Sequence, residues 1–144
     1  MAEVKREYYP SGELKAEWFE INGIIEGEYK GYHDNGKLSF ICNYVNGKGE
    51  GEYKGYYDDG KLSSICNYVN GKCEGVYKGY HENGQLAVIY NYVNDMKDGE
   101  LKVYYDNGQL AEIANYVNGH KEGEWATYTM DGKLKKARTF PKRK

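Results

Sequence analysis

A period of 24 residues runs through this chain and constrains its fold more than any other feature. Glycine recurs at every 24th position from Gly12 to Gly132, and a leucine follows two residues after each of these glycines. Residues 27–50 and 51–74 are identical at 20 of 24 positions. A fixed period of this length is typical of repeat proteins, in which each unit contacts mainly its neighbours.

The period divides the chain into six units of one predicted repeat domain, residues 1–144. The two ends are the least regular units, as the capping units of repeat proteins are. The predicted units are an N-terminal cap at 1–26, central repeats at 27–50, 51–74, 75–98 and 99–122, and a C-terminal cap with a basic tail at 123–144.

Each unit contains two turn signals. In the second unit these are Asn35-Gly36 and Asn46-Gly47. Asn-Gly between runs of Tyr, Val and Ile predicts a hairpin, because both central residues of a type I′ turn need a positive φ. One hairpin per unit follows, with strands near 28–33 and 37–45. Recurrent Gly and β-branched residues disfavour helices.

The unusual composition follows the same grid. The chain has 17 Tyr and 19 Gly, of which 16 Tyr fall in four columns of the repeat and 18 Gly fall in four others. Only 40% of the residues are hydrophobic, and many of these are Tyr. We therefore expect columns of stacked Tyr in place of a thick aliphatic core. The predicted fold is all-β: an elongated antiparallel β-meander of about six 24-residue hairpins in a single-layer twisted sheet, each unit adding about 9.6 Å.

The sequence leaves the assignment of the two sheet faces open. Tyr29 and Tyr32 differ in parity, so either both faces carry apolar rows, or Gly31, Gly55 and Gly79 mark bulges that shift the phase of the strand. The residues assigned a structural role in the repeat are Tyr32, Tyr56, Tyr80, Tyr104, Gly36, Gly60, Gly84, Gly108, Leu38, Leu62, Leu86 and Leu110.

The repeat motif resembles a known family. Its pattern is Gly-x-(Tyr/Trp)-x-x-Tyr-(Tyr/His)-x-(Asn/Asp)-Gly-(Lys/Gln)-Leu, followed by Asn-Tyr-Val-Asn-Gly-Lys. This pattern resembles the MORN-repeat variant of bacterial YwqK-type antitoxin-like proteins, from Tyr8 to about Phe140. The resemblance implies an antiparallel hairpin array, with protein binding or toxin neutralisation as the expected activity. Departures that affect the regularity of the sheet occur at Glu20, Asn94-Asp95, Val103 and Thr127.

Charge is distributed unevenly along the chain. Residues 133–144 hold seven Lys or Arg and no acid, whereas the other 132 residues hold 13 basic and 22 acidic residues, a net of −9. An acidic body opposes nucleic-acid binding and adsorption to anionic membranes, so only the basic tail suits such surfaces. The first residues lack an apolar stretch, which predicts a cytoplasmic protein, or a secreted mature form whose signal has been removed.

The sequence shows no catalytic or metal-binding grouping. His33 and His81 share a column two repeats apart, about 19 Å in the predicted sheet. Cys42 and Cys66 lie one repeat apart, about 9.6 Å, which is too far for a disulfide. No Gly-x-Ser-x-Gly elbow and no Cys-x-x-Cys pair occurs. We therefore expect a protein that is not an enzyme, with no catalytic residues, no metal and no cofactor.

One aromatic column is predicted to face a partner, because it accepts either Tyr or His and lies close to a turn. Tyr combines a large contact area with a hydroxyl group, as binding surfaces require. The members of this column are Tyr9, His33, Tyr57, His81 and Tyr105.

The predicted function is that of a non-catalytic scaffold that binds a protein partner, with neutralisation of a toxin, nuclease or effector as its specific form. Two alternatives stay open. One is a module that binds carbohydrate or a cell-surface polymer, although such repeats are Trp-rich and this chain has only Trp18 and Trp125. The other is a peripheral membrane-associated scaffold of the MORN type. Open sheet edges also suggest a homodimer.

Overall fold

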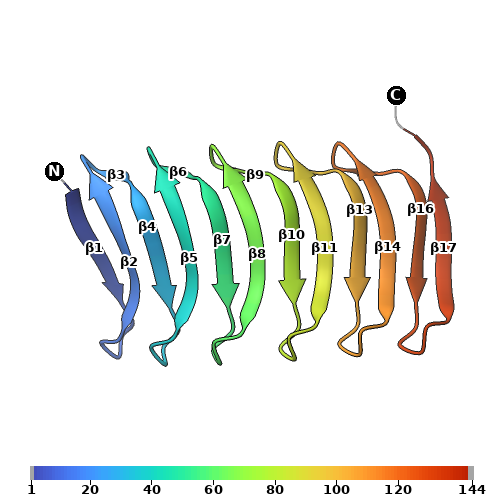
Figure 1. Cartoon of the computed structure of the whole chain (residues 1–144), viewed down its shortest axis with the longest axis horizontal. Helices are drawn as coiled ribbons and strands as arrows, with labels where there is room; N and C mark the ends of the chain where they lie inside the picture. Colours follow the sequence, from blue (N-terminus) through green and yellow to red (C-terminus); the bar gives the residue numbers. More distant parts are fainter. Residues whose placement is uncertain (1, 143–144) are drawn as a thin grey trace. The chain divides into compact units, whose positions relative to one another are not determined.

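The computed structural model describes residues 2–142, and every regular element in that range is a β-strand with antiparallel pairing. The chain divides into two compact units, Met1–Lys72 and Cys73–Lys144, and each unit holds a series of adjacent hairpins (Figure 1). The predicted all-β meander of antiparallel hairpins is confirmed within each unit. The predicted single domain over residues 1–144 stays a prediction.

The first unit contains three long hairpins. They pair β1 (Ala2–Tyr8) with β2 (Leu14–Ile21), β4 (Gly27–Tyr32) with β5 (Leu38–Val45), and β7 (Gly51–Tyr56) with β8 (Leu62–Val69). Pairings of β2 with β4 and of β5 with β7 join the hairpins. The two-residue strands β3 (Ile24–Ile25) and β6 (Lys48–Gly49) pair with the ends of β2 and β5, and β9 (Lys72–Cys73) spans the boundary in sequence.

The second unit repeats this organisation. Its long hairpins pair β10 (Gly75–Tyr80) with β11 (Leu86–Val93), β13 (Gly99–Tyr104) with β14 (Leu110–Val117), and β16 (Gly123–Tyr128) with β17 (Leu134–Phe140). The short strands are β12 (Met96–Lys97) and β15 (His120–Lys121). The sequence pattern did not predict any of the two-residue strands, because a two-residue strand has no periodicity of its own.

One of the two predicted turn types is confirmed. Asn46 and Gly47 form the two-residue loop between β5 and β6, with φ values of 52° and 79°. Both central residues therefore have the positive φ of a type I′ turn. The equivalent turn at Asn94-Asp95 lacks glycine, yet Asp95 adopts a φ of 70°, and its carboxylate accepts the backbone N–H of Cys73 at 3.0 Å. This departure from the family pattern leaves the turn intact.

The other turn differs from the prediction. Gly36 has a φ of 87°, but Asn35 is not among the residues with positive φ. The Gly36 N–H donates to the His33 carbonyl at 3.0 Å, and the Asn35 Oδ1 accepts the Lys37 N–H at 2.9 Å. The type I′ prediction for Asn35-Gly36 is wrong, because the Asn35 side chain closes this turn and Asn35 lacks the positive φ that a type I′ turn requires. The equivalent Gly60, Gly84 and Gly108 have φ values of 93°, 90° and 88°.

A bulge determines which residues share a face. Gly31 pairs in register with Phe40, but Tyr32 pairs with Leu38, so Ser39 is left without a partner in the ladder. The extra residue brings Tyr32 and Leu38 to one face, while Tyr29 stays on the other. Both of the alternatives that the sequence left open therefore hold in part: a bulge is present, and both faces carry apolar residues.

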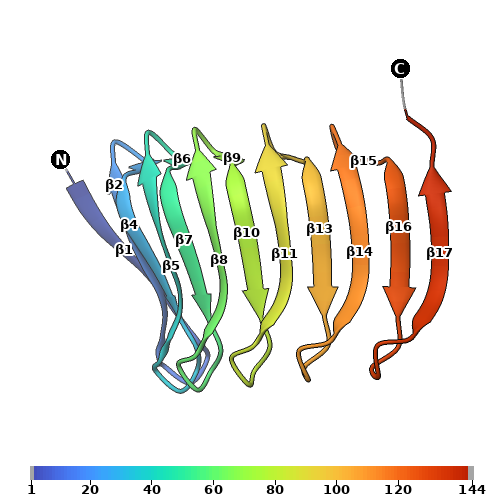
Figure 2. The same cartoon turned by 45° about the vertical axis from the view of Figure 1, so that its right-hand side comes forward.

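Neither unit has a layered core. Among residues 2–142 the only buried hydrophobic residues are Ala16, Cys66, Leu101 and Ala114. Among the described residues, no element of a unit lies over the strands of that same unit (Figures 1 and 2). Within the same range, no helix is long and apolar enough to cross a membrane. Stacked side chains on the sheet faces therefore supply the packing, as predicted from the Tyr content.

The terminal strands carry charges that discourage edge pairing. β17 contains Lys135, Lys136 and Arg138, all exposed. In β1, Arg6 bonds Glu17 of β2 at 2.8 Å, and Lys5 bonds Glu3 at 3.2 Å. Charged residues on an edge strand oppose association with a further strand. The homodimer predicted through sheet edges stays a prediction.

Candidate functional site

The predicted partner-facing column makes hydrogen bonds between repeats. Each member is half-buried. The polar tips of four of them reach the backbone carbonyl group of the next hairpin: Tyr9 to Tyr32 at 2.6 Å, His33 to Tyr56 at 2.8 Å, His81 to Tyr104 at 2.7 Å and Tyr105 to Tyr128 at 2.7 Å. Because a carbonyl oxygen only accepts, the Nε2 atoms of both histidines carry the hydrogen. These side chains therefore tie hairpins together.

Tyr57 occupies the same column at the end of β7. It is half-buried, and its backbone N–H donates to the Lys61 carbonyl at 2.8 Å. The contact that we predicted between this column and a partner stays a prediction. The hydrogen bonds between hairpins use only the polar tips of the side chains, and the exposed parts of the rings are still open to a partner. The structure does assign the column a second role, in stability.

Replacing Tyr105 with phenylalanine is expected to lower the free energy of unfolding by about 0.5–1.5 kcal/mol, because one half-buried hydrogen bond between repeats is lost. Chemical denaturation followed by circular dichroism measures the change. Tyr8→Phe is the matched control, since Tyr8 is 58% exposed. Equal effects of the two substitutions would contradict the role of the column in joining hairpins.

The bulge places the Tyr and Leu residues assigned a structural role on one face of the sheet. Tyr32 pairs with Leu38, and Tyr56 pairs with Leu62, on the face opposite Tyr29. That face also carries exposed ion pairs such as Lys30 to Glu28, at 3.1 Å. The other structural pairs are Tyr80 with Leu86 and Tyr104 with Leu110.

The opposite face of the first unit carries a continuous run of rings, which we call the aromatic face. Trp18 stacks on Tyr29 with centroids 5.1 Å apart, Tyr29 stacks on Phe40 at 5.6 Å, and Phe40 stacks on Tyr53 at 6.0 Å. Consecutive rings come from β2, β4, β5 and β7. The members of the aromatic face are Trp18, Tyr29, Phe40, Tyr44, Tyr53 and Tyr68.

A glycine makes this stack possible. Gly31 is buried beneath the Phe40 ring, and a Cβ atom at Gly31 would lie 2.1 Å from Phe40 Cε1. The ring of Phe40 can therefore lie across β4 only because position 31 has no side chain. Stacking on Tyr29 and Tyr53 holds the ring from both sides.

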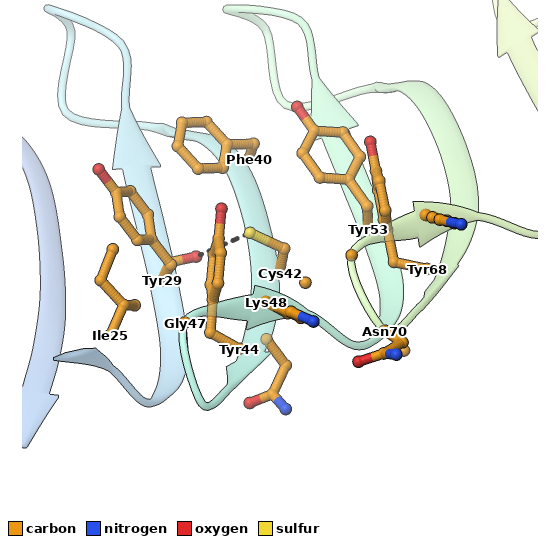
Figure 3. Close-up of a pocket in the computed structure, with 15 residues that line it drawn as sticks. Ile25, Tyr29, Phe40, Cys42, Tyr44, Gly47, Lys48, Tyr53, Tyr68 and Asn70 are labelled. Carbon is orange, nitrogen blue, oxygen red and sulfur yellow. Dashed lines mark hydrogen bonds between the residues drawn. The ribbon is translucent and has the colours of Figure 1, made fainter. Parts of the chain in front are cut away.

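The aromatic face contains an open groove of about 840 Å³. Figure 3 shows the rings of Tyr29, Tyr44, Tyr53 and Tyr68 projecting to the same side of the sheet. The groove lies beside β6, and its lining residues include Ile25, Phe40, Cys42, Lys48, Gly49 and Lys72, with no carboxylate among those described.

Burial shifts the pKa of three titratable groups in the groove. Burial raises the pKa of the Tyr29 and Tyr44 hydroxyls above the ordinary value. Burial also raises the pKa of the Cys42 thiol, whose Sγ donates to the Tyr29 carbonyl at 3.9 Å. Tyr29 and Tyr44 therefore offer apolar ring faces and uncharged hydroxyl groups at neutral pH, and Cys42 lacks the thiolate character of a nucleophile.

The corresponding face of the second unit carries rings and lysines. Tyr77 stacks on Tyr90 with centroids 4.8 Å apart, and burial, followed by a hydrogen bond with Tyr92, raises the pKa of Tyr90. Lys97 and Lys121 lie over aromatic rings here. Among the described residues, no group of three or more His, Cys, Asp or Glu is arranged to hold a metal ion.

Reasoning from the sequence missed the aromatic face as a site. It placed Tyr29 and Tyr32 on different faces but could not say which neighbours joined each, since that depends on the bulge at Ser39. One signal was present: Gly49 is the single glycine outside the four glycine columns of the repeat. The groove lies beside Gly49, where a residue with a side chain would take up part of the space.

Comparison with known proteins identifies the repeat. The family described as MORN repeat variant matches residues 25–46, 49–70, 74–94 and 97–118, more than half of the chain. No curated protein matches the chain significantly.

Two solved structures of streptococcal complexes are similar over part of the chain. One is described as accessory secretory protein 1, 2 and 3 in Streptococcus pneumoniae, with 16% identity and a TM-score of 0.39 over 69% of this chain and 18% of that chain. The other is the Glycosylation Associate Protein (Gap123) complex from Streptococcus agalactiae, with 19% identity and a TM-score of 0.41 over 69% and 18%. The chain spans less than a fifth of the matched chain in either structure, and likeness at these TM-scores does not bear on its partners.

Proposed function

Since the chain belongs to the MORN repeat variant family and is a repeat scaffold, we propose that it is a non-catalytic module that binds a protein partner through the aromatic face of its first unit. The observation that supports this proposal is the open groove of about 840 Å³ among partly exposed rings that no other element of the unit covers. Contiguous exposed apolar surface of this kind marks interaction sites.

The chemistry of the groove favours a protein as the ligand. Tyr and Trp are enriched in protein interfaces because they combine a large rigid area with a polar tip. The stacked rings are already fixed by their neighbours, with Trp18 and Tyr29 at an interplanar angle of 7°, so binding costs little side-chain entropy. Neutralisation of a toxin, nuclease or effector is the specific form of the proposal, supported by the resemblance to antitoxin-like repeats.

Gly49→Lys tests the proposal, because the new side chain fills the groove. Protein captured from the source cell by the immobilised chain is identified and purified, and its affinity is then measured by surface plasmon resonance. We expect Gly49→Lys to weaken binding at least about tenfold, which corresponds to about 1.4 kcal/mol. Val4→Lys is the matched control: it adds the same charge at a residue that is 47% exposed, on the face opposite Trp18.

Three outcomes would decide against the proposal. Equal affinity of Gly49→Lys and wild type would remove the groove from the interface. Loss of binding in Val4→Lys would point to charge alone. Glycan-array binding that Gly49→Lys abolishes, with no protein captured, would favour the carbohydrate-binding alternative. Phenylalanine variants of the column from Tyr9 to Tyr105, in the same assay, test whether that column also contacts the partner.

A further inference from the structure

One end of the groove is positively charged. Lys48 and Lys72 line it from two neighbouring repeats, both are exposed, and no carboxylate is among the described lining residues. The same column of the repeat holds Ile24, Met96 and His120 elsewhere, so lysine in two consecutive repeats occurs only beside the groove. We call these two lysines, with the part of the groove beside them, the basic end of the groove.

Neither lysine is neutralised by an ion pair within the chain. Among the ion pairs of residues 2–142, none involves Lys48 or Lys72. By contrast, Lys54 on the opposite face bonds Glu52 at 3.3 Å. The two ammonium groups of the basic end are therefore available to an anion from outside the chain.

The carboxylates that contact the neighbouring turns bond the backbone. Glu26 accepts the Asn46 N–H at 2.7 Å, and Glu50 accepts the Asn70 N–H at 2.7 Å. These bonds hold the turns that precede β6 and β9. Glu26 and Glu50 therefore stabilise the turns, and neither forms an ion pair with a lysine of the groove.

The two lysines lie around one turn. A Cβ atom at Gly71 would lie 3.5 Å from the Cβ and 3.9 Å from the Cδ of Lys48, so the Lys48 side chain runs across the turn that precedes Lys72. Asn70 of that turn also lines the groove, and Figure 3 shows Lys48 and Asn70 below the rings. A carboxamide can donate hydrogen bonds. The basic end therefore combines two ammonium groups with an amide donor.

We propose that the basic end of the groove receives an aspartate or glutamate side chain of the protein partner, within reach of Lys48 and Lys72, while an apolar neighbour of that residue packs on the rings. This inference rests on the proposed function and specifies the partner: a protein segment that combines acidic and apolar residues. Hydrogen bonds between ammonium and carboxylate groups are charge-assisted, and charge complementarity of this kind gives an interface its specificity.

The charge of the rest of the chain favours a short acidic segment over a uniformly anionic surface. Outside residues 133–144 the net charge is −9, which repels an anionic membrane as a whole. A segment with one or two carboxylates experiences much less of this repulsion. Its apolar residues also cover the ring surface of the groove, which lipid headgroups do not.

The test uses short synthetic peptides as probes for the basic end. The first is acetyl-Gly-Leu-Glu-Leu-Glu-Gly-amide, the second has glutamine in place of glutamate, and the third has lysine. Backbone amide shifts of Gly49 and Gly71 in the full chain are followed by NMR at fixed ionic strength. We expect saturable shifts with the glutamate peptide, and binding about threefold or more tighter than with the glutamine peptide, which keeps the size without the charge. The lysine peptide should bind most weakly.

Variants make the test specific to the two lysines. The double variant Lys48→Gln, Lys72→Gln should bind the glutamate and glutamine peptides equally. Its matched control is Lys30→Gln, Lys54→Gln, which removes two charges from the opposite face and should keep the preference for glutamate. Raising the ionic strength should weaken binding of the glutamate peptide to wild type, since salt screens exposed charges. The comparison of the three peptides uses wild type alone and does not depend on how the variants fold.

The inference is overturned if the glutamine or lysine peptide binds as tightly as the glutamate peptide, if no peptide shifts the two glycines, or if the control variant loses the preference as the lysine variant does. Flotation with phosphatidylserine vesicles tests the other source of anions. Vesicle binding that requires Lys48 and Lys72, without binding of the glutamate peptide, would assign the basic end to lipid headgroups.

Failure of this inference can be told apart from failure of the proposed function. Gly49→Met fills the groove without adding a charge, so it tests the groove independently of its lysines. A captured partner that Gly49→Met weakens, but that is indifferent to Lys48 and Lys72, leaves the groove as the interface and removes the acidic side chain. A partner that is indifferent to Gly49→Met removes the interface itself.

Discussion

Replacing Gly31 with alanine lowers the free energy of unfolding by about 1–3 kcal/mol, the usual cost of forcing extra volume into a packed site. The new Cβ would lie 2.1 Å from Phe40 Cε1. The Phe40 ring cannot simply move aside, because Tyr29 stacks on it at 5.6 Å and Tyr53 at 6.0 Å. Urea denaturation followed by circular dichroism measures the change.

The matched control for this substitution is Gly49→Ala. Gly49 lies in β6, and a Cβ there would make an ordinary contact of 3.5 Å with Tyr68. We expect a change within about 0.5 kcal/mol. A second comparison isolates the ring: in a Phe40→Ala background, Gly31→Ala should cost little more, since the clashing atoms are gone. An equal cost in both backgrounds would show that backbone strain, and not the ring, opposes the side chain.

Replacing Leu101 with alanine is expected to lower the free energy of unfolding by about 2 kcal/mol or more, as truncation of a buried leucine does. Leu101 is 7% exposed and pairs with Ala114, which is 1% exposed. With so few buried residues in either unit, the neighbours of Leu101 have little other apolar surface to compensate for its loss. The change is measured by chemical denaturation of the second unit within the full chain.

Leu134→Ala provides the comparison for Leu101. Leu134 begins β17 and is 62% exposed, so its truncation should change the free energy of unfolding by about 0.5 kcal/mol or less. Similar losses for the two leucines would mean that exposure of the side chain does not determine its contribution in this fold. The pair therefore tests whether the few buried positions stabilise the unit.

Local chemistry explains why much of the fold could be predicted. Asn46 and Gly47 form a two-residue turn between β5 and β6, and the repeat multiplies that signal. The first turn was predicted less well, because the Asn35 side chain bonds the Lys37 N–H, a contact that the Asn-Gly pattern does not distinguish from a type I′ turn. The presence of a hairpin in each unit could therefore be predicted from the sequence, whereas the backbone geometry of its first turn could not.

The candidate site could not be predicted in the same way. Adding one unpaired residue to a strand exchanges the faces of every residue beyond it, and nothing in the sequence marks Ser39 as that residue. The column of Tyr9, chosen because it accepts Tyr or His and lies close to a turn, uses the polar tips of at least four members to bond the next hairpin. The aromatic face and its groove emerge only when the bulge is placed.

The bonds between successive hairpins have a consequence for how such a chain grows. Tyr9 donates to the Tyr32 carbonyl in the way that His33 donates to the Tyr56 carbonyl, so donor and acceptor stand 23 residues apart in both cases. An in-frame duplication of 24 residues contains its own donor side chain and its own acceptor carbonyl group. Lengthening or shortening by whole repeats therefore leaves no bond without a counterpart, and the size of the proposed binding surface can evolve independently of the fold.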